Sequence, residues 1–459
     1  MKRLIVVLIV LILLALSLPV SNLIAGLPTS KLRTVTSDDP LYLNAMAVLG
    51  AKCVNCHTPE YNLPFYAAFP IARSIIEHDI RTGLKFINYL ESLIPEEGQP
   101  VSEVVLAKTE QVITDNSMPP MRYLALHWNG GLSKTERETV LAWIHDVRAK
   151  HYTTEGVAPK FRNEMVQPLP PVESLNLDAR KVALGDKLFH DTRLSTDNTI
   201  SCASCHDLQK GGTDQARFST GVGGAVGDIN APTVFNAGFQ FMQFWDGRAA
   251  DLQEQADGPV NNPIEMASNW TEVIGKLEQD EAFTKEFLAV YPEGYSKDTI
   301  TKAIAIFEES LLTPSRFDQY LRGDENALTD NEKRGYALFK QYGCATCHVG
   351  KILGGQSFEK MGLYQDYFAD RGNVHTPDYG RFNFTQREGD RFKLKVPTLR
   401  NIAITFPYFH DGTTSDLKEA VKTMVKYQTE RARISDRDAD LIVAFLKALT
   451  GEYAGQPLQ

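Results

Sequence analysis

The chain has 459 residues, of which 43% are hydrophobic and 23% are charged, and its formal net charge is −9. This length corresponds to about three domains of roughly 100–200 residues each, and the composition is that of an ordinary globular protein. The acidic balance argues against nucleic acid or an anionic lipid surface as a partner.

The first 30 residues are predicted to form a membrane anchor. Leu4 to Ser30 contains no charge and follows Lys2 and Arg3. A bilayer span needs about 20 apolar residues, so Leu4 to Gly26 is long enough, and the two cations would stay cytoplasmic. This predicts a single-pass protein of the inner membrane, with the rest of the chain in the periplasm. The alternative is a cleaved signal peptide, because Ala15-x-Ser17 is a possible cleavage site.

All six cysteines belong to three copies of the pattern Cys-x-x-Cys-His. The copies are Cys53-Val54-Asn55-Cys56-His57, Cys202-Ala203-Ser204-Cys205-His206 and Cys344-Ala345-Thr346-Cys347-His348. This pattern attaches c-type haem: both thiols form thioethers, and the histidine is the proximal iron ligand. A redox dithiol needs no adjacent histidine, and three pairs do not divide into four-ligand zinc sites. The sequence therefore predicts three covalently bound haem c groups.

Similar predicted helices surround these motifs. Gly185-x-x-Leu188-Phe189 and Gly335-x-x-Leu338-Phe339 precede the second and third motifs on segments with helical apolar spacing. Each unit also closes on a helix in which a serine, Ser133, Ser296 or Ser435, precedes an alanine by nine residues. No long strand pattern occurs. We therefore predict an all-α fold of three cytochrome c-like haem domains behind an N-terminal transmembrane helix.

Proline and glycine mark the expected domain boundaries. The prolines between Pro159 and Pro171 indicate a linker because successive prolines cannot lie inside a helix, and a second boundary is expected between Thr313 and Leu328. The predicted parts are the anchor or signal peptide over 1–30, a monohaem domain over 31–158, a second haem domain over 172–325 and a third over 326–459.

The sixth iron ligand decides what each haem can do. A methionine or histidine closes the iron, whereas an empty position admits a small molecule. In the first unit we predict Met118 as this ligand, with Met121 and His127 as competitors and an ordinary core role for Met118 as the alternative. Met266 could close the second haem by its spacing alone. Met424 lies on the apolar side of a predicted helix, where position alone favours a core residue.

Longer motifs run through the second and third units. They are Leu188-Phe189-His190-Asp191-Thr192-Arg193-Leu194-Ser195, Asn230-Ala231-Pro232-Thr233-Val234-Phe235-Asn236, Phe244-Trp245-Asp246-Gly247-Arg248-Ala249, Asn262-Pro263-Ile264-Glu265-Met266, Leu399-Arg400-Asn401 and Pro407-Tyr408-Phe409-His410. From about Leu175 to the end, the chain closely resembles the bacterial di-haem cytochrome c peroxidase/MauG family. With its N-terminal haem unit and anchor, the whole chain resembles the trihaem, membrane-attached quinol peroxidases.

The resemblance implies a role for each haem. The haem of His206 would react with peroxide, and the haem of His348 would transfer electrons with Met424 as its distal ligand. Glu265 and Gln255 match the distal glutamate and glutamine of the family. A carboxylate there can take a proton from the inner peroxide oxygen and return it to the outer one. Gln255 would orient the peroxide.

One position departs from the family pattern. Many di-haem relatives carry a removable distal histidine in the loop where this chain has Val222. Valine cannot bind iron. We therefore predict that the peroxidatic haem is open in the fully ferric protein and needs no reductive activation.

The resemblance also implies a calcium ion between these two haems. The matching ligands are the side chain of Asn230 and the carbonyls of Thr405 and Pro407, an oxygen set suited to a hard cation. His410 would support the haem environment without binding iron.

These features together predict a trihaem peroxidase that reduces hydrogen peroxide to water. Electrons from membrane quinol would enter near the N-terminal haem, pass to the third haem and reach the second by way of Trp245. Quinol follows from the anchor and from the fused cytochrome unit, which would replace a diffusing donor. One alternative is a MauG-like enzyme that oxidises a partner protein, although such enzymes use a tyrosine where Met424 stands. The other is a trihaem electron carrier, against which Val222 and Glu265 argue.

Overall fold

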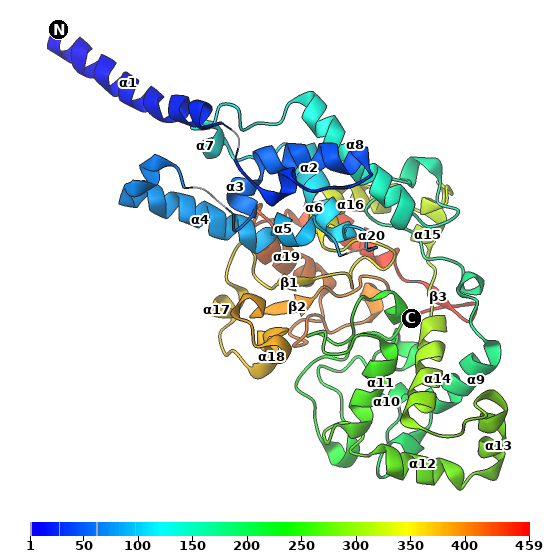
Figure 1. The fold of residues 1–459 in the computed structure, drawn as a ribbon. Helices are drawn as coiled ribbons and strands as arrows, with labels where there is room; N and C mark the ends of the chain where they lie inside the picture. Colours follow the sequence, from blue (N-terminus) through cyan, green and yellow to red (C-terminus); the bar gives the residue numbers. More distant parts are fainter. Residues whose placement is uncertain (1, 27, 61–62, 97) are drawn as a thin grey trace. The chain divides into compact units, whose positions relative to one another are not determined.

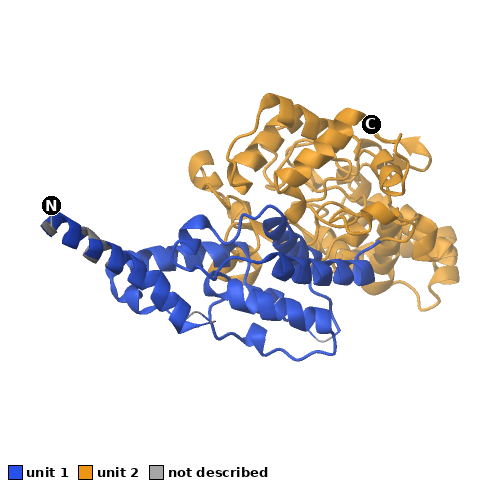
Figure 2. Ribbon diagram, turned by 90° about the horizontal axis from the view of Figure 1, so that it is seen from above, with its two compact units in different colours: residues 1–153 blue, residues 154–459 orange. Residues whose placement is uncertain are grey.

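The computed structural model describes residues 2–26, 28–60, 63–96 and 98–459, and this part of the chain is mostly helical (Figure 1). The chain divides into two compact units, residues 1–153 and 154–459 (Figure 2).

The helices of the first unit are α1 (Lys2–Ala25), α2 (Pro40–Lys52), α3 (Val54–His57), α4 (Pro70–Phe86), α5 (Tyr89–Ser92), α6 (Glu103–Thr114), α7 (Met121–Leu124) and α8 (Lys134–His151). The helices of the second unit are α9 (Ala179–Phe189), α10 (Cys202–Cys205), α11 (Leu252–Asn261), α12 (Trp270–Glu278), α13 (Glu281–Val290), α14 (Lys297–Ser310), α15 (Arg316–Leu321), α16 (Asp330–Gln341), α17 (Tyr367–Arg371), α18 (Phe382–Thr385), α19 (Leu417–Gln428) and α20 (Asp436–Lys447). Its short strands are β1 (Phe358–Lys360), β2 (Lys393–Lys395), β3 (Glu452–Tyr453) and β4 (Gln456–Pro457).

The first unit is built around the first Cys-x-x-Cys-His motif. Helix α2 begins at Pro40 because the Asp39 carboxylate accepts hydrogen bonds from the first free backbone N–H groups. Helices α2, α6 and α8 then bury Met46, Leu106 and Trp143 in one apolar core. Cys53 caps the end of α2, so this core fixes the position of the motif.

The predicted membrane anchor is wrong. Helix α1 has 24 residues, but within the described ranges none of the helices is both long enough and apolar enough to cross a membrane. The end of α1 is instead tied to its own unit, because Pro19 is buried and the Asn22 amide donates hydrogen bonds to the Tyr66 hydroxyl (3.1 Å) and the Leu126 carbonyl (2.9 Å). The described part of the chain is therefore mostly helical without the predicted transmembrane helix, and the predicted single-pass location in the inner membrane is not supported.

The second unit contains two helical cores of the same design. In one core α9 crosses α14, and in the other α16 crosses α20. At the first crossing a Cβ on Gly185 would lie 2.0 Å from the Ala303 carbonyl oxygen, and at the second a Cβ on Gly335 would lie 1.9 Å from the Leu441 carbonyl oxygen. Only glycine permits this approach, which explains the repeated Gly-x-x-Leu-Phe pattern. The division into three haem domains remains a prediction.

A second repeat in this unit becomes visible in three dimensions. It consists of Pro232-Thr233-x-x-Asn236 and Pro397-Thr398-x-x-Asn401. In each copy the threonine hydroxyl donates to a backbone carbonyl at 2.6 Å, and the asparagine has φ near +60°. Both asparagine amides donate to the Thr313 hydroxyl, at 2.7 and 2.9 Å. The two copies therefore meet at one buried residue.

Two small antiparallel pairs complete the second unit. Strands β1 and β2 pair Phe358 with Lys395, and β3 and β4 form a hairpin near the C-terminus. Strand β2 also contacts the Phe244-Trp245 motif, because the Lys395 N–H donates to the Trp245 carbonyl at 2.8 Å.

Glu308 on α14 gives a prediction about stability. It is 5% exposed, its Oε2 has no hydrogen-bond partner among the described residues, and burial raises its pKa to about 8. The unfolded chain has a glutamate pKa of about 4.3, so unfolding releases this proton and stability falls as the pH rises from about 4 to 8. We expect Glu308→Gln to be more stable than the parent by about 2–4 kcal/mol at pH 8 and equal to it near pH 4, measured by denaturant unfolding. Equal pH slopes in the two proteins would contradict this.

Candidate functional site

The three histidines of the motifs share one geometry. Each backbone N–H donates to the carbonyl of the first cysteine, at 3.1 Å for His57, 2.9 Å for His206 and 3.0 Å for His348. Each Nδ1 faces a backbone carbonyl, and these carbonyls belong to Ile87 (3.4 Å), Gly212 (3.3 Å) and Leu353 (3.0 Å). A proton on Nδ1 leaves the lone pair on Nε2, which is the atom that binds iron. Burial lowers the pKa of each ring, to about 4 in His348, so the rings are neutral.

The cysteines also fit haem attachment. All six are free, and burial raises the pKa of Cys53 and Cys344 to about 12. Thiols with such pKa values are poor redox nucleophiles, because the thiolate is the reactive form. Gly83 of α4 lies so close to the first motif that a Cβ there would be 2.3 Å from the Cys56 carbonyl oxygen. The donor sets therefore suit c-type haem.

The segment around Met118 lies in the same unit as the first motif. The Asn55 amide of the motif donates to the Tyr123 hydroxyl at 3.1 Å, which brings α7 against the motif. His127 stacks on Tyr123 with ring centroids 3.9 Å apart, and its Nδ1 faces the Tyr123 carbonyl. Met121 is 80% exposed and Met118 is 40% exposed. Met118 remains the predicted ligand.

In the second unit the structure brings Val222 and Glu265 together. The Val222 N–H donates to the Glu265 carbonyl at 2.9 Å, and a Cβ on Gly221 would lie 2.5 Å from the same oxygen. The Glu265 carboxylate accepts a hydrogen bond from the Asn262 amide at 2.6 Å. Burial raises the pKa of Glu265, while Asn262 and Arg248 oppose this rise. A carboxyl group in this setting can hold a proton and give it back.

Gln255 and Met266, the two other residues considered for this site, differ in burial. Gln255 lies half-buried on α11, and no hydrogen bond between the Gln255 and Glu265 side chains is present in the described part of the chain. Met266 is buried in the core with Leu184 and Val260, and its N–H donates to the Pro259 carbonyl.

Trp245 connects the segments expected to lie between two haems. Its indole N–H donates to the Asn230 carbonyl at 2.9 Å, and the Asn230 N–H donates to the His410 carbonyl at 2.8 Å. The Asn230 amide nitrogen donates to the Ala216 and Arg217 carbonyls, which leaves its oxygen available to a cation. His410 Nε2 is hydrogen-bonded to Asp378 at 2.7 Å and is therefore engaged away from iron. Thr405 and Pro407 lie on the segment that leads to His410.

Met424 packs against the apolar cluster that contains Trp245. A second methionine, Met361, is buried in this cluster. Sequence reasoning missed Met361 because it lies between β1 and α17, where no periodic pattern marks it. Its sulfur accepts a hydrogen bond from the Gln428 amide at 3.4 Å, so Met424 is the better candidate ligand.

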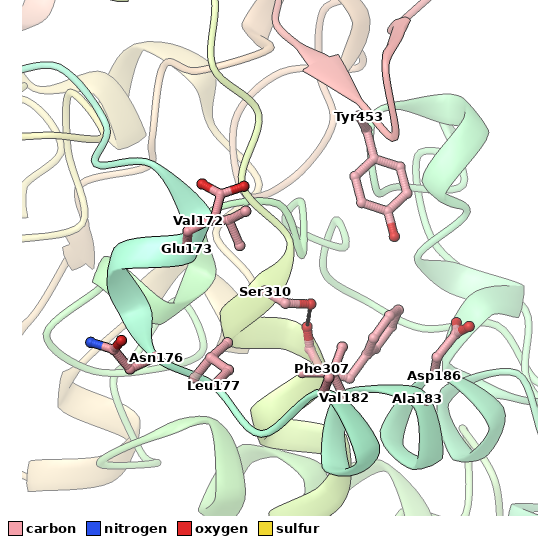
Figure 3. Close-up of a pocket in the computed structure, with 11 residues that line it drawn as sticks. Val172, Glu173, Asn176, Leu177, Val182, Ala183, Asp186, Phe307, Ser310 and Tyr453 are labelled. Carbon is pink, nitrogen blue, oxygen red and sulfur yellow. Dashed lines mark hydrogen bonds between the residues drawn. The ribbon is translucent and has the colours of Figure 1, made fainter.

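A surface pocket of about 420 Å³ is lined by other residues (Figure 3). Leu177, Phe307 and Tyr453 supply apolar walls, and the carboxylates of Glu173 and Asp186 lie at its edge. None of the predicted site residues lines this pocket, so it is not the expected peroxide site.

Three Cys-x-x-Cys-His motifs with backbone-oriented imidazoles, set among packed helices, define a protein with covalently bound c-type haem. Residues 179–326 match the family Di-haem cytochrome c peroxidase, and residues 12–146 match the family Haem-binding domain.

Relatives support the same conclusion. The chain is 53% identical over 405 residues to cytochrome c peroxidase Ccp of Escherichia coli K12, covering 87% of this chain and 86% of that protein. It is 48% identical over 295 residues to cytochrome c551 peroxidase of Nitrosomonas europaea, covering 63% and 85%. A solved MauG-like protein associated with microbial copper homeostasis gives a TM-score of 0.55 at 30% identity, over 62% of this chain and 93% of that one. The chain belongs to the di-haem cytochrome c peroxidase/MauG family and is a peroxidase. The family resemblance of its motifs is thereby confirmed.

Proposed function

We propose that the chain is a trihaem enzyme that reduces hydrogen peroxide to two waters at the site held by Cys202, Cys205 and His206. The observation that supports this proposal is the backbone hydrogen bond from Val222 to Glu265, which joins the segment of the proposed proton-transferring carboxyl group to a loop that offers no iron ligand at Val222. When bound, the haems supply the two electrons and the iron that binds peroxide. Glu265 would take the proton from one peroxide oxygen and return it to the other oxygen, which leaves as water, and Gln255 would orient the peroxide. Two protons from solvent, together with the two electrons from the haems, would complete the second water.

The remaining predicted residues would hold the other groups. Cys53, Cys56, His57 and Met118 would hold the first haem, and Cys344, Cys347, His348 and Met424 would hold the third. Trp245 would lie between the second and third haems, and Asn230, Thr405 and Pro407 would bind calcium. The proposed domains are residues 31–158, 172–325 and 326–459.

We propose a quinol as the electron donor. The predicted anchor no longer supports a quinol. The support is the match of residues 12–146 to a haem-binding domain, which suits an electron-donating unit within the same chain. The first unit also exposes large apolar side chains that suit an apolar donor, namely Phe65, Phe69, Met121 and Trp128. Peroxide-dependent oxidation of a short-chain quinol, followed by absorbance, tests this donor. A holoenzyme that accepts electrons only from another protein would exclude it.

The open peroxide site is tested by its absorption and EPR spectra. The holoprotein should carry three haems per chain by pyridine haemochrome assay, and its ferric form at neutral pH should contain one high-spin haem. After anaerobic reduction, the holoprotein should lose two electrons for each molecule of hydrogen peroxide added. Three low-spin ferric haems would favour the electron carrier, and cross-linking or oxidation of a partner protein would favour the MauG-like alternative.

Val222→His should close the site. A histidine in this loop can bind iron, so we expect the ferric high-spin signal to disappear and peroxide reduction to require prior reduction of the enzyme. Val226→His is the matched control because Val226 is 61% exposed in the same loop. If both variants keep the high-spin signal, the loop does not face the peroxide-binding iron.

A further inference from the structure

Lys395 is a buried cation without an anionic contact among the described residues. It is 4% exposed, and its Nζ donates to the Met242 carbonyl at 2.9 Å. Asp246 is the carboxylate that acts on it electrostatically, but Asp246 is already paired with Arg248 at 3.0 Å. Burying an unpaired ammonium group costs several kcal/mol. An anion from outside the polypeptide beside Nζ would offset this cost and let the group stay charged.

The position of Lys395 in the fold indicates which anion this is. Lys395 stands two residues before Pro397, as Asn230 stands two residues before Pro232 in the other copy of the repeat. The backbone of Lys395 is bonded to Trp245, and Trp245 is bonded to Asn230. The Pro397 carbonyl faces the ring of His348. Lys395 thus ends strand β2 two residues before Pro397, and its backbone is bonded to the tryptophan expected between two haems.

We propose that Lys395 binds a propionate carboxylate of the haem attached to Cys344 and Cys347. This assignment rests on the proposed haem binding at the third motif. A haem carries two propionates, and a lysine ammonium has three donors, of which Met242 takes one. Without an anion, burial lowers the pKa of Lys395 to about 7, and a carboxylate at Nζ keeps the group charged. A fixed positive charge there also favours the reduced state of this haem, which carries one positive charge fewer than the oxidised state.

The test compares two lysines on one strand. Lys395→Met removes the proposed contact, and Lys393→Met is the control because Lys393 is 35% exposed and pairs with Asp390 at 3.1 Å. For Lys395→Met we expect a lower midpoint potential of the methionine-ligated third haem and a shifted propionate bending band in the resonance Raman spectrum. Lys393→Met should leave both unchanged.

The outcomes separate this proposal from the one on which it rests. A parent protein with fewer than three haems would overturn the trihaem function. A Lys395→Met protein that keeps three haems, with unchanged potential and unchanged propionate bands, would overturn the Lys395 assignment alone, as would a shift confined to the second haem. If Lys395→Met does not incorporate haem, Lys395→Gln is measured by the same criteria, because it removes the charge and keeps a polar group.

Discussion

Glu265→Gln should lower the rate of peroxide reduction by about 10²–10⁴-fold, the range expected when a general acid–base group is lost. The amide keeps the size of the side chain and its hydrogen bond to Asn262 but cannot accept the peroxide proton. The measurement is stopped-flow oxidation of the pre-reduced holoenzyme by one equivalent of peroxide. Glu278→Gln, an exposed change on α12, is the control and should react like the parent.

The pH dependence provides a second readout for Glu265. The carboxyl group must be ionised to take the proton, and burial raises its pKa above that of an ordinary glutamate. Activity should therefore fall as the pH is lowered, starting at a higher pH than an exposed glutamate would give, and this acid limb should be absent in Glu265→Gln. A variant with full haem content and a rate within tenfold of the parent would remove Glu265 from the mechanism.

Short sequence motifs predict those structural features that depend only on residues close together in the chain. The Cys-x-x-Cys-His motifs place each histidine one turn after its first cysteine, and the backbone bonds of His57, His206 and His348 follow from that spacing. The two Gly-x-x-Leu-Phe segments have helical apolar spacing, and both lie in helices, α9 and α16. These features could be predicted because short segments determine them.

Features that depend on distant contacts could not be predicted in this way. The apolar run in α1 indicated a membrane span, but its end is held by Asn22 on Tyr66, a contact between residues 44 positions apart. Lys395 looks like an ordinary strand residue until burial is known. The two Pro-Thr-x-x-Asn segments are recognised as a repeat only in the structure, because both of their asparagines donate to the Thr313 hydroxyl.

Arg400→Met should destabilise the second unit by about 3–5 kcal/mol, because it removes one partner of a buried ion pair. Arg400 is fully buried and donates to both Asp318 oxygens, at 2.7 and 2.8 Å. Asp318 also accepts hydrogen bonds from the backbone N–H groups of Leu169 and Ser315, so its carboxylate cannot turn to solvent. Without the guanidinium, this negative charge stays buried and uncompensated.

Two experiments test whether the buried charge of Asp318 causes this loss of stability: lowering the pH, and breaking an ion pair at the surface. Burial alone would raise the pKa of Asp318, but Arg400 and the backbone donors hold it below its usual value. The pair therefore stabilises the parent above the unfolded aspartate pKa of about 3.9, and the stabilisation disappears as the pH falls below it. In denaturant unfolding the difference between parent and Arg400→Met should shrink with decreasing pH. Arg391→Met, which breaks the pair between Arg391 and Glu388 at the surface, should cost far less, because solvent screens that pair. An equally small cost for Arg400→Met would mean that Asp318 is neutral in the folded protein, because only a buried carboxylate makes the loss of its partner expensive.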